Sequence, residues 1–193
     1  ANTTPVWHGG RLYMTKEDAL AYEVNPHTLE TLGAWTYGGK LRSQTMTAHP
    51  RIDPETGEMF MFGYEADGLC STSVAFFVAD REGNLKSEEW FKAPYTSLMH
   101  DFGLTKNYAI FPVFPTKTDL ARLKAGGVHW THEQDGDSWV GIMPRYGKGS
   151  EVRWFKGPKG IFAFHYINAF EADGKVHIDV CLPRQTTINY LYS

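Results

Sequence analysis

Residues 97–105 read Ser-Leu-Met-His-Asp-Phe-Gly-Leu-Thr and place His100 beside an acid, between two apolar segments. Two further histidines have comparable surroundings: His49 precedes a turn, and His165 lies within the apolar run at 162–170. The three histidines are separated by 51 and 65 residues. Imidazole is a good ligand for iron, copper, nickel and zinc. We therefore predict that the three side chains come from separate strands and converge on one metal ion.

Outside these stretches, short apolar runs alternate with turn residues, which predicts an all-β fold. Strands are expected at residues 10–14, 21–24, 29–35, 59–64, 73–79, 85–91, 108–114, 139–144, 152–155, 163–170 and 176–180, the last two forming a hairpin across the turn at 171–175. A single short helix is predicted at 116–125, with Thr116 or Thr118 as its cap and Gly126-Gly127 as its end.

The spacing of the turns indicates how the strands are grouped. Turn signals at Asn25, Asp53 and Asp80 are 28 and 27 residues apart. Two hairpins would then make a unit of about 40–60 residues, which is close to one blade of a β-propeller. The histidine spacing fits one histidine per blade, with the helix lengthening the second interval. We predict that residues 1–193 are part of a single β-propeller domain with a helical insertion near 116–126, and a β-sandwich is the alternative.

Composition excludes several classes of function. The chain has 19 basic and 22 acidic side chains and a net charge of −3, so it has no electrostatic basis for binding nucleic acid or an anionic membrane. No apolar run approaches 18 residues, and no membrane-spanning helix is expected. Cys70 and Cys181 are too few for a disulfide scaffold. We expect them to be reduced core thiols of a cytoplasmic protein.

The other five histidines are expected to be surface or structural residues, because they lie in turns or polar settings or alternate outward on a strand: His8, His27, His129, His132 and His177. A structural zinc site is disfavoured because cysteine is absent from the three-histidine set. A zinc hydrolase is disfavoured because the chain has no His-Glu-x-x-His motif.

Several motifs together resemble a known family. They are His-Gly-Gly-Arg-Leu at 8–12, Lys-Glu-Asp at 16–18, Asn-Pro-His-Thr-Leu-Glu-Thr-Leu-Gly at 25–33, Ala-His-Pro-Arg at 48–51, His-Asp-Phe at 100–102 with Thr105, and His-Tyr-Ile-Asn-Ala-Phe-Glu at 165–171. Over essentially its whole length the chain resembles the carotenoid cleavage oxygenases, which are non-haem iron dioxygenases. Within that family it is most similar to the bacterial stilbene-cleaving branch, the lignostilbene dioxygenases.

The resemblance implies a seven-bladed propeller with Fe(II) on its axis, held by four histidines. His49, His100 and His165 match the first three, and no residue here matches the fourth or a substrate-binding tyrosine of the family. Glu17 matches a glutamate that accepts a hydrogen bond from a ligand histidine, which fixes the imidazole tautomer. We therefore expect a central segment of a longer protein, with about three or four blades.

Lys16 distinguishes the branch. In the stilbene-cleaving enzymes that the chain resembles, a lysine at this position binds the 4-hydroxyl group of the substrate, so Lys16 is predicted to have a substrate-binding and a catalytic role. Asp101 and Glu171 lie beside or near the predicted ligands and are further candidates to support them.

The expected activity is cleavage of the central C=C bond of a phenolic stilbene by O2, which gives two aromatic aldehydes. The partners are then a small phenolic stilbene and O2, and a homodimer is compatible with this interpretation. Two alternatives remain: the same chemistry on a carotenoid or apocarotenoid, and a propeller module that binds a ligand without catalysis.

Overall fold

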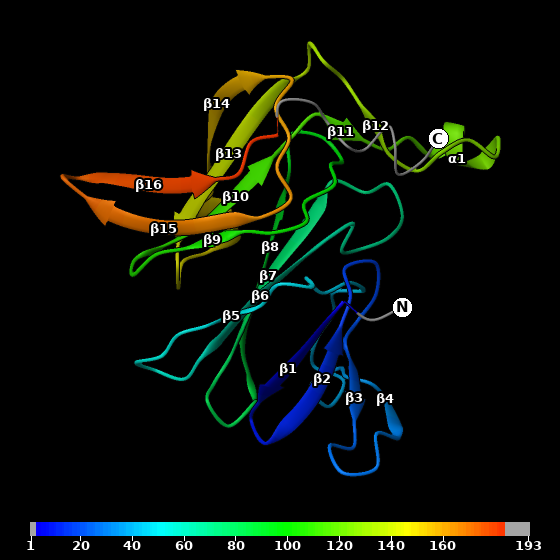
Figure 1. Ribbon diagram of the computed structural model, residues 1–193, viewed down its shortest axis with the longest axis vertical. Helices are drawn as coiled ribbons and strands as arrows, with labels where there is room; N and C mark the ends of the chain where they lie inside the picture. The colour runs from blue at the N-terminus through cyan, green and yellow to red at the C-terminus, as the bar shows by residue number, and fades with distance from the viewer. Residues whose placement is uncertain (1–2, 184–193) are drawn as a thin grey trace. The chain divides into compact units, whose positions relative to one another are not determined.

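The computed structural model describes residues 3–183, and nearly all of its regular structure is strand (Figure 1). The chain divides into two compact units, one ending at Trp90 and the other beginning at Phe91, and each is described by itself. The prediction of an all-β fold is therefore confirmed.

The first unit contains two four-stranded sheets in which the strands follow in chain order. The first sheet consists of β1 (Thr4–His8), β2 (Arg11–Thr15), β3 (Tyr22–Val24) and β4 (Thr31–Ala34), all antiparallel. The second consists of β5 (Arg51–Ile52), β6 (Met59–Tyr64), β7 (Ser73–Ala79) and β8 (Leu85–Lys92), whose last two residues pass the boundary between the units. Such up-and-down four-stranded sheets have the topology of propeller blades.

The same side-chain device forms three of the turns in this unit. Asn25 Oδ1 accepts hydrogen bonds from the backbone N–H groups of residues 27 and 28, and Asp53 Oδ1 accepts from those of residues 55 and 56. Asp80 Oδ1 accepts from the backbone N–H groups of residues 82 and 84. Short polar side chains that bond to the backbone two residues ahead favour a reversal of the chain. The three turn signals in the sequence are therefore confirmed as turns.

The core of the first unit is built on β6 and β7, in which every residue is buried. Strands covered on both faces are continuously apolar, which is why both matched the sequence pattern over their full length. The Tyr37 hydroxyl donates to Met61 Sδ across 3.1 Å, so the phenol is satisfied inside the core. Each fully buried large apolar side chain contributes about 1.5–3 kcal/mol to folding.

The described part of the second unit contains one four-stranded sheet and two two-stranded sheets, of which one is a hairpin (Figure 1). The sheet has the order β14-β13-β10-β9, formed by β9 (Gly103–Leu104), β10 (Tyr108–Val113), β13 (Asp137–Pro144) and β14 (Arg153–Lys159). An excursion between β10 and β13 holds β11 (Thr116–Lys117), α1 (Leu120–Lys124) and β12 (Thr131–His132), and the short 3₁₀ helix η1 (Gly149–Glu151) precedes β14. The hairpin pairs β15 (Tyr166–Ala172) with β16 (Lys175–Val180) across a two-residue turn.

The predicted helix is present but shorter than expected, and its predicted cap is wrong. Asp119 is the N-cap, and its side chain accepts from Arg122 N at 2.8 Å. Thr116 instead lies in β11, where it pairs with the other strand of the excursion. A one-turn helix needs its cap directly before it, and aspartate is among the strongest N-caps. No residue of α1 is buried, which agrees with a surface insertion.

Two further expectations can be compared with the described residues. None of the helices between residues 3 and 183 is long and apolar enough to cross a membrane. Cys70 and Cys181 are free thiols, but the expectation that both lie in the core is wrong. Cys70 is half-buried in a turn with φ at 62°, and Cys181 is exposed just after β16.

Candidate metal centre

The three candidate ligands share one position in the fold. His49 precedes β5, His100 precedes β9 and His165 directly precedes β15, so each lies just before the first strand of its own sheet or hairpin. The expectation that they lie on the strands themselves is wrong, because all three are in irregular segments. A loop next to a rigid sheet is a common place for a functional side chain, because it is held by the sheet without being part of its ladder.

His100 and His165 meet within the second unit. Their Nε2 atoms are 3.2 Å apart, and the rings lie edge to face with centroids 4.9 Å apart. Each neutral imidazole has one N–H donor and one lone pair, so two facing nitrogens need a proton or a cation between them. Two nitrogens bound to one ion at about 2.1 Å are about 3.0–3.4 Å apart for octahedral to tetrahedral angles. The pair therefore has the spacing that two ligands of one metal require.

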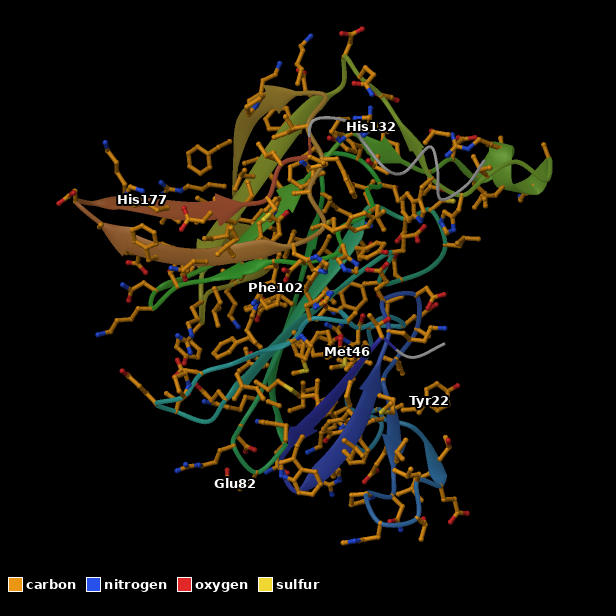
Figure 2. The ribbon with its side chains drawn as sticks, in the orientation of Figure 1. Tyr22, Met46, Glu82, Phe102, His132 and His177 are labelled. Carbon is orange, nitrogen blue, oxygen red and sulfur yellow. The ribbon has the colours of Figure 1, made fainter. Side chains whose placement is uncertain are left out.

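Aromatic side chains pack around this pair. The ring of Phe164 lies edge to face with His100, at a centroid distance of 5.2 Å, and Phe162 packs against Phe164 at 4.7 Å. Phe102, two residues after His100 and labelled in Figure 2, is fully buried. Its ring stacks on that of Phe111. An apolar surround limits access of water to a metal and restricts the rotation of its ligands.

Within the first unit, His49 lies close to the end of β2. The Thr15 hydroxyl, which is fully buried, lies 2.9 Å from Thr4 O and 3.1 Å from Ala48 O. It therefore links the strand that leads to Lys16 with the residue before His49. The backbone N–H of His49 donates to Thr47 Oγ1 at 3.0 Å, which closes the local turn.

Lys16 forms an ion pair that the sequence did not predict. Its Nζ atom is 2.8 Å from Asp18 Oδ1, and the lysine side chain is 27% exposed whereas that of Asp18 is 72% exposed. An ion pair so open to solvent contributes at most about 1 kcal/mol, so another anion can replace the aspartate. Glu17, the residue between them, is half-buried.

The remaining two acidic candidates lie in the second unit. Asp101 is buried, and its carboxylate accepts hydrogen bonds from the backbone. Glu171 is on β15 and accepts from the Thr105 hydroxyl at 2.6 Å and from the Asn107 side chain at 2.8 Å. The role of Thr105 and Asn107 was missed, although a Thr-x-Asn turn between two strand-like runs is a signal for side-chain hydrogen bonding.

Three of the histidines expected to be structural have structural partners in the described chain, and Figure 2 labels two of them, His132 and His177. The buried His8 bonds through Nε2 to Gly57 O at 2.8 Å. His132 bonds through Nδ1 to the Thr116 hydroxyl and through Nε2 to Gly160 O. His177 stacks on Phe170 with the ring planes 6° apart.

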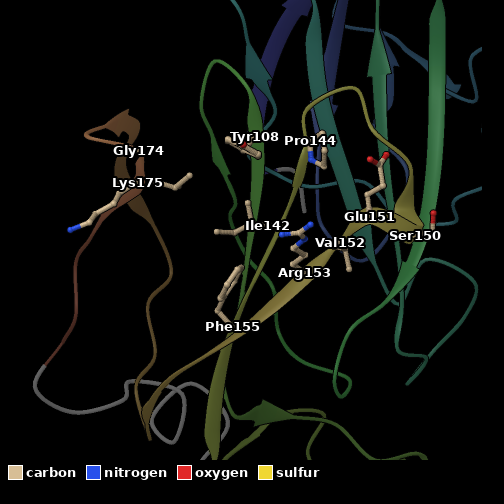
Figure 3. Close-up of a pocket in the computed structure, with 11 residues that line it drawn as sticks. Tyr108, Ile142, Pro144, Ser150, Glu151, Val152, Arg153, Phe155, Gly174 and Lys175 are labelled. Carbon is tan, nitrogen blue, oxygen red and sulfur yellow. The ribbon is translucent and has the colours of Figure 1, made fainter.

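A separate groove of about 910 Å³ lies in the second unit (Figure 3). It is lined by residues of β13, β14 and the β15–β16 turn, with Phe155 and Ile142 on its apolar side and Arg153 and Lys175 among its charged residues. Neither His100 nor His165 lines it. The groove is therefore distinct from the histidine pair.

These features first define a class: an all-β protein of the propeller type that brings imidazoles together at the ends of its sheets. The model of the retinal pigment epithelial membrane protein family matches residues 1–193. The chain belongs to this family, which comprises the carotenoid cleavage oxygenases.

Relatives and solved structures agree with this membership. The chain is 47% identical over 182 residues to lignostilbene-alpha,beta-dioxygenase isozyme III of Sphingomonas paucimobilis, and 43% identical over 180 residues to isoeugenol monooxygenase of Pseudomonas nitroreducens. Each match covers 93% of this chain and 37% of the relative. The crystal structure of Pseudomonas brassicacearum lignostilbene dioxygenase superimposes with a TM-score of 0.93 at 42% identity, covering 99% of this chain and 40% of that one. The chain thus spans about two fifths of the length of these proteins, and the predicted propeller class is confirmed.

Proposed function

We propose that this protein is a non-haem iron(II) dioxygenase that cleaves the central double bond of a phenolic stilbene with O2 and releases two aromatic aldehydes. The observation that carries the proposal is the pair of Nε2 atoms of His100 and His165, 3.2 Å apart in a member of this family. The similarity to a lignostilbene dioxygenase supports this choice of substrate class.

In this proposal His49, His100 and His165 hold the iron, and a fourth histidine, implied by the family resemblance, has no match in the chain. A neutral imidazole set suits Fe(II) and leaves the full positive charge on the ion. When bound, iron would supply coordination positions at which O2 is activated. Glu17 accepts a hydrogen bond from the N–H of a ligand imidazole, which would orient that ring.

Lys16 binds the 4-hydroxyl group of the substrate. Its ammonium donates a hydrogen bond to the phenolic oxygen and stabilises the phenolate form, displacing Asp18 from its exposed ion pair. A phenolate-like oxygen pushes electron density through the conjugated ring toward the alkene, which makes the double bond more reactive toward oxygen. The rigid planar substrate needs little further ordering once its phenol end is held.

The test of the metal centre is the set His49→Ala, His100→Ala and His165→Ala in the enzyme. Each variant is expected to lose stoichiometric iron and to lower turnover of a phenolic stilbene at least about 100-fold, because neighbouring ligands cannot replace a lost imidazole. His177→Ala is the matched control, because the His177 ring lies on β16 and stacks on Phe170 of the paired strand β15. Stoichiometric iron retained in all three ligand variants would refute the proposed site.

The second candidate is the same cleavage reaction on a carotenoid or apocarotenoid, which the family membership favours. A hydrocarbon polyene offers no phenolic hydroxyl to Lys16, so a direct comparison of the two substrate classes separates the candidates. A non-catalytic binding module would show neither bound iron nor oxygen consumption with a phenolic stilbene.

We further propose a cytoplasmic location, supported by the two free thiols. A homodimer belongs to the same proposal, and light scattering of the purified enzyme would test it.

A further inference from the structure

We infer that Asp101 is a positioning residue that sets the separation of the His100 and His165 imidazoles. The inference rests on the proposed metal centre and concerns how the chain holds two of its ligands at bonding distance from one ion. It assigns Asp101 no contact with substrate or metal.

The carboxylate of Asp101 accepts hydrogen bonds from the backbone just after each histidine. Its Oδ1 atom accepts from Phe102 N at 2.8 Å, and its Oδ2 atom accepts from Tyr166 N at 3.1 Å. Phe102 lies two residues after His100, and Tyr166 lies directly after His165. One side chain, only 3% exposed, therefore joins two backbone segments that are 65 residues apart.

The backbone ladders do not make this link. His165 is exposed and lies outside any strand, and β9 and β15 belong to separate sheets although they lie beside each other. Within the described part of the chain, the segment with His100 is thus attached to the segment with His165 through side chains. A charged acceptor bonded to a backbone N–H makes a stronger and shorter link than a neutral one.

Close packing shows that the two segments are pressed together. A Cβ atom on Gly103 would lie 3.2 Å from Ile178 Cδ1 and 3.3 Å from Ala169 Cβ, both on the hairpin. The backbone at Gly103 therefore lies so close to β15 and β16 that even a methyl group there would make a tight contact. Loss of the Asp101 link would release the end of this contact at which both imidazoles lie.

The carboxylate of Glu171 joins the same two segments farther from the histidines, so its removal can be compared with the removal of Asp101. Glu171 reaches from β15 to the Thr105 hydroxyl and to the backbone and side chain of Asn107. Both carboxylates join the same two segments, but only Asp101 is adjacent to a candidate ligand. A purely structural role predicts similar consequences for removing either one, whereas a positioning role predicts that only Asp101 affects the metal.

The experiment measures Co(II) binding to the metal-free enzyme, by competition with a chromophoric chelator and by the visible ligand-field bands of the bound ion. Asp101→Ala is expected to weaken Co(II) binding about 10- to 100-fold and to shift these bands, as loss of a residue that orients ligands typically does. Asp101→Asn keeps one acceptor and should lie in between. Glu171→Ala should melt at a lower temperature, with Co(II) affinity within about twofold of the parent.

The outcomes separate this inference from the proposed function. If the parent enzyme binds Co(II) no better than His165→Ala, the metal centre itself fails and the inference fails with it. If binding depends on His165 but Asp101→Ala and Asp101→Asn both bind like the parent, or if Glu171→Ala weakens binding as much as they do, only the positioning role is overturned. Should Asp101→Ala not fold, Asp101→Asn against Glu171→Gln makes the same comparison.

Discussion

In the proposed function, Lys16 is the residue that distinguishes phenolic stilbenes from substrates without a hydroxyl group. Its ammonium is partly buried and is held by an exposed aspartate, so its charge is available to an incoming anionic oxygen. The same side chain gains nothing from a substrate without a hydroxyl group. The contribution of Lys16 to the reaction should therefore depend on a single oxygen atom of the substrate.

We predict that Lys16→Ala lowers kcat/KM about 100-fold for a 4-hydroxystilbene, which is the usual effect of removing one donor that stabilises developing charge. For the matching stilbene without the hydroxyl the loss should be less than about fivefold. Lys40→Ala, at an exposed lysine of the same unit, is the control. Equal losses on both substrates would remove Lys16 from activation of the phenol.

Thr15 is a second single residue with a specific role, because its buried hydroxyl group stabilises the fold. Thr15→Val keeps the shape of the side chain but leaves the buried Ala48 carbonyl without this donor, so we predict a loss of about 1–3 kcal/mol in the free energy of unfolding. Thr15→Ser retains the hydroxyl and should cost less. Urea denaturation of the three proteins measures the difference, and equal stabilities of the valine variant and the parent would contradict the role.

Several of these residue-scale features could not be predicted from the sequence. The identities of His49, His100 and His165 were indicated by their spacing and by the family resemblance, but a local pattern cannot show that each lies just before a strand rather than on it. The Asp101–Tyr166 and Lys16–Asp18 contacts depend on tertiary placement and side-chain rotamers. The strands β6 and β7 were predictable at their full length because burial on both faces makes them continuously apolar.

At the scale of elements, the sheets of the first unit contact each other through their turns. Gly9, between β1 and β2, has φ of 55°, and a Cβ atom there would lie 2.5 Å from Gly83 Cα, in the turn between β7 and β8. Gly10 has φ of 73° with no atom within 4 Å of such a Cβ. Alanine substitutions at Gly9 and Gly10 therefore distinguish two costs in the free energy of unfolding. At Gly10 the cost comes from positive φ alone, and at Gly9 a steric clash with the turn at Gly83 is added.

We predict that Gly10→Ala destabilises the protein by about 1–2 kcal/mol, through positive φ alone. Gly9→Ala should cost about 1–3 kcal/mol more, because the turn of the other sheet must also move. Denaturant unfolding of the two variants side by side gives the comparison. Equal costs would show that the two turns do not depend on this contact.

Glu171 attaches β15 to the turn at residues 105–107, and this attachment depends on pH. Hydrogen bonds from the Thr105 side chain, and then from Asn107, lower the pKa of this carboxyl below its usual value. Because the pKa of Glu171 is lower in the folded protein than in the unfolded chain, the ionised carboxylate stabilises the fold. This stabilisation is complete above the unfolded pKa, about 4.3, and is lost as the pH falls through the folded pKa.

We therefore predict that Glu171→Gln melts at a lower temperature than the parent at pH 6–7, and that this difference shrinks below about pH 4, near the unfolded pKa. Thermal melts at several pH values measure it. The Asp179→Asn variant, at an exposed position on β16, is the control for a general effect of charge. A difference that stays constant from pH 7 to pH 3 would show that the charge of Glu171 is not involved.

At the scale of the whole molecule, a metal that binds only the folded protein must raise its stability. The gain is RT ln(1 + [metal]/Kd), or about 2.7 kcal/mol at a free metal concentration 100 times Kd. For a protein of this size that corresponds to about 5–10 °C in melting temperature. We predict this shift when Co(II), or Fe(II) under anaerobic conditions, is added to the metal-free protein. The His165→Ala variant should show no such shift.

The same measurement distinguishes a specific site from general binding of cations. His177→Ala removes a ring that stacks on Phe170, and this variant should keep the full shift in melting temperature. Mg²⁺ should give no shift, because a set of imidazoles is a poor site for a hard, oxygen-preferring ion. If His165→Ala were stabilised as much as the parent, the added metal would be bound elsewhere, and the pair of nitrogens 3.2 Å apart would have to be explained as a hydrogen bond between two neutral rings. In that case one imidazole donates and the other accepts.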